Sequence, residues 1–358
     1  MTTEVVLGID GGNTKTVAVV ATTYGEVLGT GHGTCSDIYG AASAQEALDV
    51  LVGVVREALA GAGVSAADVA ATVGSLAGAD WPEDYELYRF ELSHRAGLSG
   101  RVRVLNDGVG PVRLAERSGT GAAVVLGTGA AVGARGPGGD IWHGSFWLPV
   151  GGAGWLGRQA LGAVYRATLG IGPPTSLRET LLGLYGETDE EALLHTLTQR
   201  RSSSRAQGWE GAAGAALLDA DARGDAVARD IVASYTAHLA PYVMVATQKV
   251  GLGSSFSVVL TGGLLRHPTS TLARRLADSV TTLAPYARVV RSTAPPVTGA
   301  VLEAIALSGS EVTDALVETV AASGLLAALG TGTELTATAP FLTVLSSPAQ
   351  LSGAASPL

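Results

Sequence analysis

GIDGGNTKT, at residues 8–16, is a glycine-rich turn flanked by two apolar runs, residues 4–9 (EVVLGI) and 16–21 (TVAVVA). Each run has the length and the β-branched content of a buried strand, and the residues between them are those that close tight turns. We therefore expect the chain to open with a β-hairpin, followed by a third strand at 26–30. This opening differs from a Walker A loop, in which the glycines and GK[ST] precede a helix.

The turn Asp10-Gly11-Gly12-Asn13-Thr14-Lys15 has the residue types of a phosphate-binding loop. Glycines let the backbone approach a phosphate closely and turn its N–H groups toward the oxygens. Thr14 and Lys15 add a hydroxyl and a cation, and Asp10 at the strand end is placed to hold Mg²⁺ through water, because this hard cation prefers oxygen ligands. A plain glycine-rich hairpin with a solvated lysine would have the same sequence.

Two further glycine motifs follow in the second half of the chain. Residues 121–135 repeat the opening pattern, with the turn Gly127-Thr128-Gly129 between two apolar strands. Residues 256–261 then form an apolar run that ends in Gly262-Gly263, just before a helical pattern whose N-terminus could face a nucleotide. Each motif alone is compatible with an ordinary turn, but their order and spacing together predict a duplicated α/β core around a nucleotide.

The pattern of the whole chain predicts two lobes. We expect residues 1–117 to form an N-terminal α/β lobe and 118–295 to form a second α/β lobe, with a helical insertion at about 155–250. A helix at about 296–309, after Pro295-Pro296, is expected to return to the first lobe. The extension 310–358 changes in composition, and an appended strand, a lid over the other lobe and a disordered tail all remain open.

Asp107 is the candidate catalytic base. It follows an apolar strand at 101–105 and lies between the two hairpins, where the lobes would meet. There a carboxylate could accept the proton of a substrate hydroxyl as that oxygen attacks a γ-phosphoryl group. The alternative is a structural one, because Asn106-Asp107-Gly108 is also a common β-turn sequence.

These motifs resemble those of the actin, hexokinase and Hsp70 ATPase superfamily. More narrowly, the chain resembles the BadF/BadG/BcrA/BcrD ATPase and N-acetylglucosamine kinase family, which includes bacterial glucosamine kinases. The matching stretches occur in family order and are GIDGGNTKT (8–16), SLAGAD (75–80), LNDG (105–108), VVLGTGAAVG (124–133), GWLGRQALGAVYR (154–166), GPPTSL (172–177), VVLTGGLL (258–265) and PPVTGAVLEAI (295–305).

The resemblance implies a two-lobed actin-like ATPase fold, with a ribonuclease H-like mixed-sheet core in each lobe. It implies an enzyme that uses ATP and Mg²⁺ and transfers phosphate to a small sugar, with glucosamine or N-acetylglucosamine as the expected acceptor. Asp107 matches the family's catalytic base, and the other acceptor-side positions are Ser36, Asp37, Asp80 and Asn106. A structural role in turns is an open alternative for these four residues.

One stretch departs from the family pattern. Family members commonly carry an acidic residue in a glycine-rich loop of the form GDxGS or GDWGG before the helical insertion. Here Pro149 and Val150 stand in the corresponding stretch, so the sequence leaves open a different sugar or a cyclitol as acceptor. The run Trp142–Trp147 just before it either shapes an altered pocket or only packs the lobe.

Composition and charge narrow the remaining possibilities. The 358 residues are 47% hydrophobic with a net charge of -9, which suits a folded two-domain protein and disfavours a nucleic-acid partner. One cysteine, Cys35, disfavours the iron–sulfur site of a dehydratase-activating ATPase, and the six histidines show no metal-binding spacing. We expect a cytoplasmic homodimer without signal peptide or membrane span; an ATPase module or a nucleotide-binding regulator is the alternative class.

Overall fold

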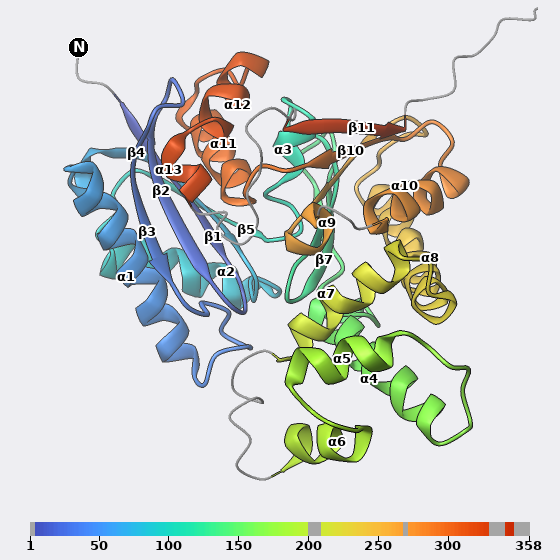
Figure 1. Cartoon of the computed structure of the whole chain (residues 1–358). Coiled ribbons are helices and arrows are strands. Elements are labelled where there is room, and N and C mark those ends of the chain that lie inside the picture. The colour runs from blue at the N-terminus through green and yellow to red at the C-terminus, as the bar shows by residue number, and fades with distance from the viewer. Residues whose placement is uncertain (1–3, 200–208, 268–270, 329–340, 347–358) are drawn as a thin grey trace, which may run out of the picture.

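Two mixed β-sheets, one from each half of the chain, form the framework of the structure (Figure 1). This computed structural model describes residues 4–199, 209–267, 271–328 and 341–346. The first sheet has the strand order β3-β2-β1-β4-β5. Its strands are β1 (Val5–Gly11), β2 (Thr16–Thr22), β3 (Val27–Gly33), β4 (Val69–Leu76) and β5 (Arg101–Asn106).

The second sheet repeats this topology. Its order is β11-β10-β9-β6-β7-β8, so β8-β7-β6-β9-β10 corresponds to β3-β2-β1-β4-β5. In each sheet an antiparallel hairpin (β1–β2 or β6–β7) pairs in parallel with the next strand. The predicted duplicated mixed-sheet core is therefore confirmed. The strands are β6 (Gly121–Leu126), β7 (Ala130–Arg135), β8 (Ile141–His143), β9 (Ser257–Thr261), β10 (Arg288–Ser292) and β11 (Leu342–Ser346).

Alternation along the central strands distributes apolar side chains between layers, because successive strand residues point to opposite faces. In β1, Val5, Leu7 and Ile9 pack with α1 (Ala44–Ala62), whereas Val6 faces α11 (Val297–Ser308). In β9, Val258 and Leu260 face the helices of the second half, while Val259 shares the core of Val6. The first sheet is thus covered on both faces, and α11 lies between the halves of the molecule (Figure 1).

The described part of the segment predicted to be mostly helical forms five helices, which lie below and beside the second sheet in Figure 1. They are α4 (Ala153–Thr168), α5 (Leu177–Tyr185), α6 (Glu190–Thr198), α7 (Trp209–Ala222) and α8 (Ala226–Lys249). The other helices are α2 (Pro82–Phe90), which continues as a π-helical turn at Glu91–Arg95, α3 (Val112–Ala115), α9 (Gly263–Arg266), α10 (Leu272–Leu283), α12 (Asp314–Ala321) and α13 (Gly324–Ala328).

A buried ionic cluster joins the two halves. Glu303 of α11 is fully buried and accepts hydrogen bonds at 2.8 and 3.0 Å from Arg135 of β7. The Arg113 Nε of α3 lies 3.0 Å from the same carboxylate. Removing one partner of such a cluster leaves an uncompensated buried charge, which typically costs about 3–5 kcal/mol. The cluster therefore fixes α11, which packs on β1, against the second sheet.

The C-terminal extension contacts both halves. Val317 and Val320 of α12 and Leu326 of α13 pack into the core beneath α11, and β11 pairs antiparallel with β10 at the edge of the second sheet. Of the three open alternatives, the described part 341–346 is an appended strand. No helix among the described residues is long and apolar enough to cross a membrane. The division into lobes at residue 117 stays a prediction.

Candidate functional site

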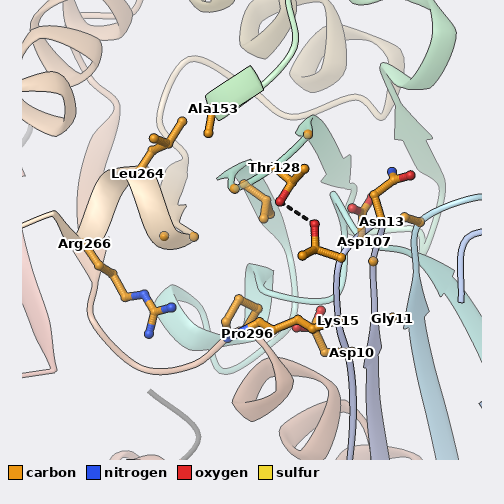
Figure 2. Close-up of a pocket in the computed structure, with 18 of the residues that line it drawn as sticks. Asp10, Gly11, Asn13, Lys15, Asp107, Thr128, Ala153, Leu264, Arg266 and Pro296 are labelled. Carbon is orange, nitrogen blue, oxygen red and sulfur yellow. Dashed lines mark hydrogen bonds between the residues drawn. The ribbon is translucent and has the colours of Figure 1, made fainter. Parts of the chain in front are cut away.

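A cavity of about 430 Å³ lies where the two hairpins face each other (Figure 2). It is lined by residues predicted as nucleotide-binding, together with the predicted base Asp107: Asp10, Gly11, Gly12, Asn13, Thr14, Lys15, Gly127, Thr128, Gly129, Gly262 and Gly263. The three glycine motifs and the candidate base, far apart in the sequence, therefore meet at one place.

The first hairpin presents its turn to this cavity. The Gly12 N–H donates to the Lys15 carbonyl at 3.0 Å, which closes the turn. A Cβ at Gly11 would lie 2.5 Å from Ser36 Oγ, so a larger residue here would have to displace that buried side chain. Burial raises the pKa of Asp10 to about 6, against the opposing charges of Lys15 and Arg266. The turn thus combines backbone N–H groups, a cation and a carboxyl group.

The second hairpin meets the first at its tip. The hydroxyls of Thr14 and Thr128 are 2.6 Å apart, and Figure 2 shows this bond as a dashed line. The Ala153 N–H at the start of α4 donates to the Gly127 carbonyl at 2.8 Å. A helix N-terminus and the second turn therefore lie beside the first turn, an arrangement that favours anionic ligands.

The β9–α9 turn forms the far side of the cavity. Gly262 has a φ of 104°, and a Cβ there would lie 2.3 Å from the Leu126 carbonyl oxygen, so glycine is required. Gly263 next to it faces open space. Arg266 lines the cavity, burial lowers its pKa, and its buried Nε has no hydrogen-bond partner in the described part of the chain. An anionic ligand would satisfy this guanidinium.

Asp107 directly follows β5 and is partly buried. Burial is the largest cause that raises the pKa of this carboxyl, to about 7, and the charges of Asp10, Asp80 and Asp37 add to it. A carboxyl with a pKa near the working pH can both take up and release a proton, which suits a general base. Its position in the cavity wall places it beside the predicted phosphate-binding turns.

The four predicted acceptor-side residues gather beside this cavity but are not among its lining residues. Asn106 donates from Nδ2 to Asp80 Oδ1 at 3.0 Å, and its Oδ1 accepts from the Gly108 N–H at 2.9 Å. Asp37 is buried and its Oδ1 accepts from the Tyr39 N–H at 2.9 Å. The fully buried Ser36 hydroxyl has no partner among the described residues.

Carboxylates on this side lack cationic partners in the described structure. The hydrogen-bond donors to Asp37, Asp80 and Asp84 are backbone N–H groups and neutral side chains. No ion pair involves any of the three among the described residues. Burial, as the largest cause, raises the pKa of Asp80.

The structure also shows the surroundings of Pro149 and Val150, the stretch that lacks the acidic residue of the family pattern. Val150 is 6% exposed and packs in the core of the second half, while Pro149 is exposed. Sequence reasoning missed the polar contacts just before it, where Ser145 Oγ donates to Asp80 Oδ1 at 2.5 Å. It also missed Arg266, for which the only local signal is a cation at the end of the short helix after Gly262-Gly263.

The residues present fit a magnesium–nucleotide complex. The described residues contain no group of three or more metal-ligating side chains. Mg²⁺ in nucleotide sites is commonly held by one or two carboxylates together with phosphate oxygens and water. Asp10 in the cavity wall is such a carboxyl group, and a bound cation would offset the cost of ionising it there.

Comparisons with known proteins agree with this geometry. An N-acetyl-D-glucosamine kinase from Dictyostelium discoideum is 25% identical over 324 residues, which are 85% of this chain and 99% of that protein. A crystal structure of a candidate N-acetylglucosamine kinase from Chromobacterium violaceum has a TM-score of 0.61 at 21% identity, over 84% of this chain and 99% of its own.

A ROK family glucokinase from Streptomyces griseus, solved with glucose and AMPPNP, has a TM-score of 0.54 at 18% identity. It covers 84% of this chain and 98% of its own. These structural likenesses show the fold, that of actin-like ATPases and ROK kinases. The model of the BadF/BadG/BcrA/BcrD ATPase family matches residues 7–304 and implies ATP binding. The predicted resemblance is confirmed, and the chain belongs to the BadF/BadG/BcrA/BcrD ATPase family.

Proposed function

We propose that this protein is an ATP-dependent sugar kinase that phosphorylates the primary 6-hydroxyl of an amino sugar, glucosamine or N-acetylglucosamine. The observation that carries the proposal is Asp107, a carboxyl with a pKa raised to about 7 in the wall of the cavity formed by the three glycine motifs. The kinase names of the Dictyostelium and Chromobacterium relatives support it.

In this mechanism the nucleotide lies between the two hairpins, with its phosphates at residues 10–15 and 127–129 and its adenosine beside Gly262-Gly263. Mg²⁺, held by Asp10, would neutralise charge on the β- and γ-phosphates. Lys15, Arg266 and the backbone N–H groups of the turns would stabilise the charge of the transferring phosphoryl group.

Asp107 accepts the proton of the acceptor hydroxyl as the hydroxyl oxygen forms its bond to the γ-phosphorus. The bond from the γ-phosphorus to the β,γ-bridging oxygen breaks, and ADP leaves with the bonding electrons. Ser36, Asp37, Asp80 and Asn106 would hold the remaining hydroxyls of the acceptor. The carboxylates without cationic partners also tolerate a protonated amine on the acceptor.

A different acceptor, another sugar or a cyclitol, is the second candidate. The observation that favours it is Val150, which is buried in the core where family members commonly carry an acid in the adjoining loop. Without that carboxylate, one hydroxyl of an amino sugar would lose a strong acceptor.

The test is an assay of ADP release over a panel of amino sugars, neutral sugars and cyclitols, with the product identified by mass spectrometry. We expect a 6-phosphorylated amino sugar, and loss of turnover when EDTA removes divalent cations. Phosphorylation of another polyol alone would overturn the choice of acceptor and leave the kinase. ADP release without any phosphorylated product would instead indicate an ATPase.

A further inference from the structure

The segment Trp142–Trp147 of the second half crosses to the first half on the acceptor side. It comprises the end of β8 and the 3₁₀ turn Ser145–Trp147, just before the loop that lacks an acid. Its side chains make two independent sets of contacts, one polar and one aromatic, with α2, with the loop between β4 and α2 and with the loop after β3.

The polar contacts form a continuous chain from Tyr85 to Asp80. Tyr85 Oη lies 3.0 Å from His143 Nε2, His143 Nδ1 is hydrogen-bonded to Ser145 Oγ, and Ser145 Oγ donates to Asp80 Oδ1 at 2.5 Å. An ionised carboxylate only accepts, so the Ser145 proton points to Asp80. The Ser145 oxygen then accepts from His143 Nδ1–H, and His143 Nε2 accepts from the Tyr85 hydroxyl. A neutral His143 satisfies every link.

The chain ends next to the candidate base. Asp80 Oδ1 also accepts from Asn106 Nδ2 at 3.0 Å, and Asn106 precedes Asp107. In the described part of the chain, both hydrogen bonds to the Asp80 carboxylate fall on Oδ1, so Oδ2 retains its capacity to accept a hydroxyl. Two donors on one oxygen fix the plane of the carboxylate.

The aromatic contacts anchor the same segment on its other side. The ring of Phe146 packs edge-on against Tyr39, with centroids 5.3 Å apart, and lies nearly parallel to Trp81 at 6.4 Å. Such ring pairs stabilise a defined arrangement beyond the area they bury. The segment is therefore held to the first half at two places.

The backbone of Ser145 is consistent with a positioning role. Its φ is 35°, and it is the only residue other than glycine with a positive φ in the described part of the chain. Such a conformation persists only where the surroundings enforce it, and such positions cluster at functional sites.

We propose that His143 and Ser145 are positioning residues of the acceptor site, which orient Asp80 so that its Oδ2 accepts a hydroxyl of the sugar. This inference rests on the proposed kinase function for the identity of the ligand. Through Asp80, the segment thereby supplies a hydrogen-bond acceptor for a sugar hydroxyl, which the side chains of Pro149 and Val150 cannot supply. Neither His143 nor Ser145 touches the phosphoryl group in this proposal.

The kinetic test compares Ser145→Ala and His143→Phe with His143→Asn. The Asn amide nitrogen can replace Nδ1–H as the donor to Ser145, so this variant should rescue function. We expect the two disruptive variants to raise KM for the acceptor about tenfold, as loss of a hydrogen bond to a charged group does. KM for ATP and kcat should change little. Trp147→Ala, at a side chain that is 71% exposed, is the matched control and should behave as wild type.

Unchanged acceptor KM in both disruptive variants, with melting temperatures near wild type, would overturn the proposal. So would an equal rise in KM for ATP, or an equal effect of Trp147→Ala, because either would indicate a general structural role. If the variants fail to fold, the tautomer of His143, measured in the wild-type protein, tests the proposal instead.

That measurement does not depend on activity. In protein labelled with ¹⁵N-histidine, His143 is assigned by the signal missing from His143→Asn among the six histidines. We expect the Nδ1–H tautomer at neutral pH. An Nε2–H tautomer would overturn the proposal whatever the acceptor. If the tautomer is Nδ1–H but no sugar is phosphorylated, the proposed function fails, and with it the acceptor role of the chain.

Discussion

The two halves of the molecule share one strand order but differ in what their strand ends carry. Asp10 is the penultimate residue of β1, and Val125 is the penultimate residue of β6. After β5 the chain continues with Asp107, whereas Thr293 follows β10. The first half therefore places carboxyl groups at the cavity, and the second half places neutral residues at equivalent ends.

Because of this difference, the two halves contribute different chemical groups to the site. In the first half, burial raises the pKa of Asp107 to about 7, and the charges of Asp10, Asp80 and Asp37 add to this rise. The second half contributes glycines, a helix N-terminus and the cation Arg266. A duplicated fold thus yields an asymmetric site, in which one half would hold the nucleoside and the other would hold the metal and the base.

Replacing Asp107 with Asn should have the largest effect, because the variant keeps the shape of the base but loses its basicity. General-base catalysis is typically worth about 10²–10⁴-fold, so kcat should fall by that order. ADP binding, measured by calorimetry, should change little. If Asn106-Asp107-Gly108 is only a turn, Asn serves as well and kcat stays within a few-fold of wild type, which would remove Asp107 from the mechanism.

Asp10→Asn tests the other carboxyl group of the first half. A carboxylate that holds Mg²⁺ through water typically contributes about 10–100-fold to metal affinity, so the Mg²⁺ concentration for half-maximal activity should rise by that factor. Binding of ADP without metal should weaken little or even improve, because a negative charge leaves the phosphate site. An unchanged Mg²⁺ requirement would contradict the assignment of Asp10.

Gly263→Leu tests the neutral wall of the second half. Gly263 lines the cavity and a Cβ there meets no atom within 4 Å, so a leucine side chain has room to extend into the cavity. Filling an occupied site with extra side-chain volume costs about 1–3 kcal/mol, so KM for ATP should rise about tenfold while metal dependence is kept. Gly253→Leu, at an exposed glycine with equal space outside the cavity, is the control. Equal KM values in both variants would place the nucleotide elsewhere.

Local patterns predicted much of the fold. The apolar runs at 4–9 and 16–21 became β1 (Val5–Gly11) and β2 (Thr16–Thr22), and the helix expected at about 296–309 became α11 (Val297–Ser308). Periodicity and turn glycines are properties of neighbouring residues, so they can be read from the sequence. The role of the tail could not be read from the sequence in this way, because β11 depends on its pairing with β10, some fifty residues earlier in the chain.

The same distinction holds at the candidate site. The glycines and Asp10 and Asp107 stand in recognisable motifs, and the structure brings them to one cavity. Ser145 carries no motif, and its contact with Asp80 joins residues 65 positions apart. The aromatic run around Ser145 is compatible by sequence with a pocket or with a packing role, because that choice depends on what the other half presents to it.

The smallest expected effect is a pH dependence of activity that arises from the carboxyl groups of the first half. Asp107 must be ionised to accept a proton, and its pKa is raised to about 7. For the free enzyme, kcat/KM for the acceptor should rise from pH 6 and level off near pH 8. At pH 7 kcat/KM should reach about half of its plateau value, because a group is ionised in half of the molecules when the pH equals its pKa.

Stability should change in the opposite direction over the same range. A carboxyl whose pKa is raised on folding binds its proton more tightly in the folded state, so the free energy of unfolding falls as the pH rises through about 7. Asp10, with a pKa raised to about 6, contributes the same sign at slightly lower pH. The melting temperature of the wild type should therefore decrease from pH 6 to pH 8, and that of Asp107→Asn should decrease less, because Asn does not titrate. A flat kcat/KM profile together with identical melting curves for the two proteins would show that Asp107 ionises well below this range. The burial of Asp107 and the carboxylates around it would then not raise its pKa as the comparison of the two halves requires.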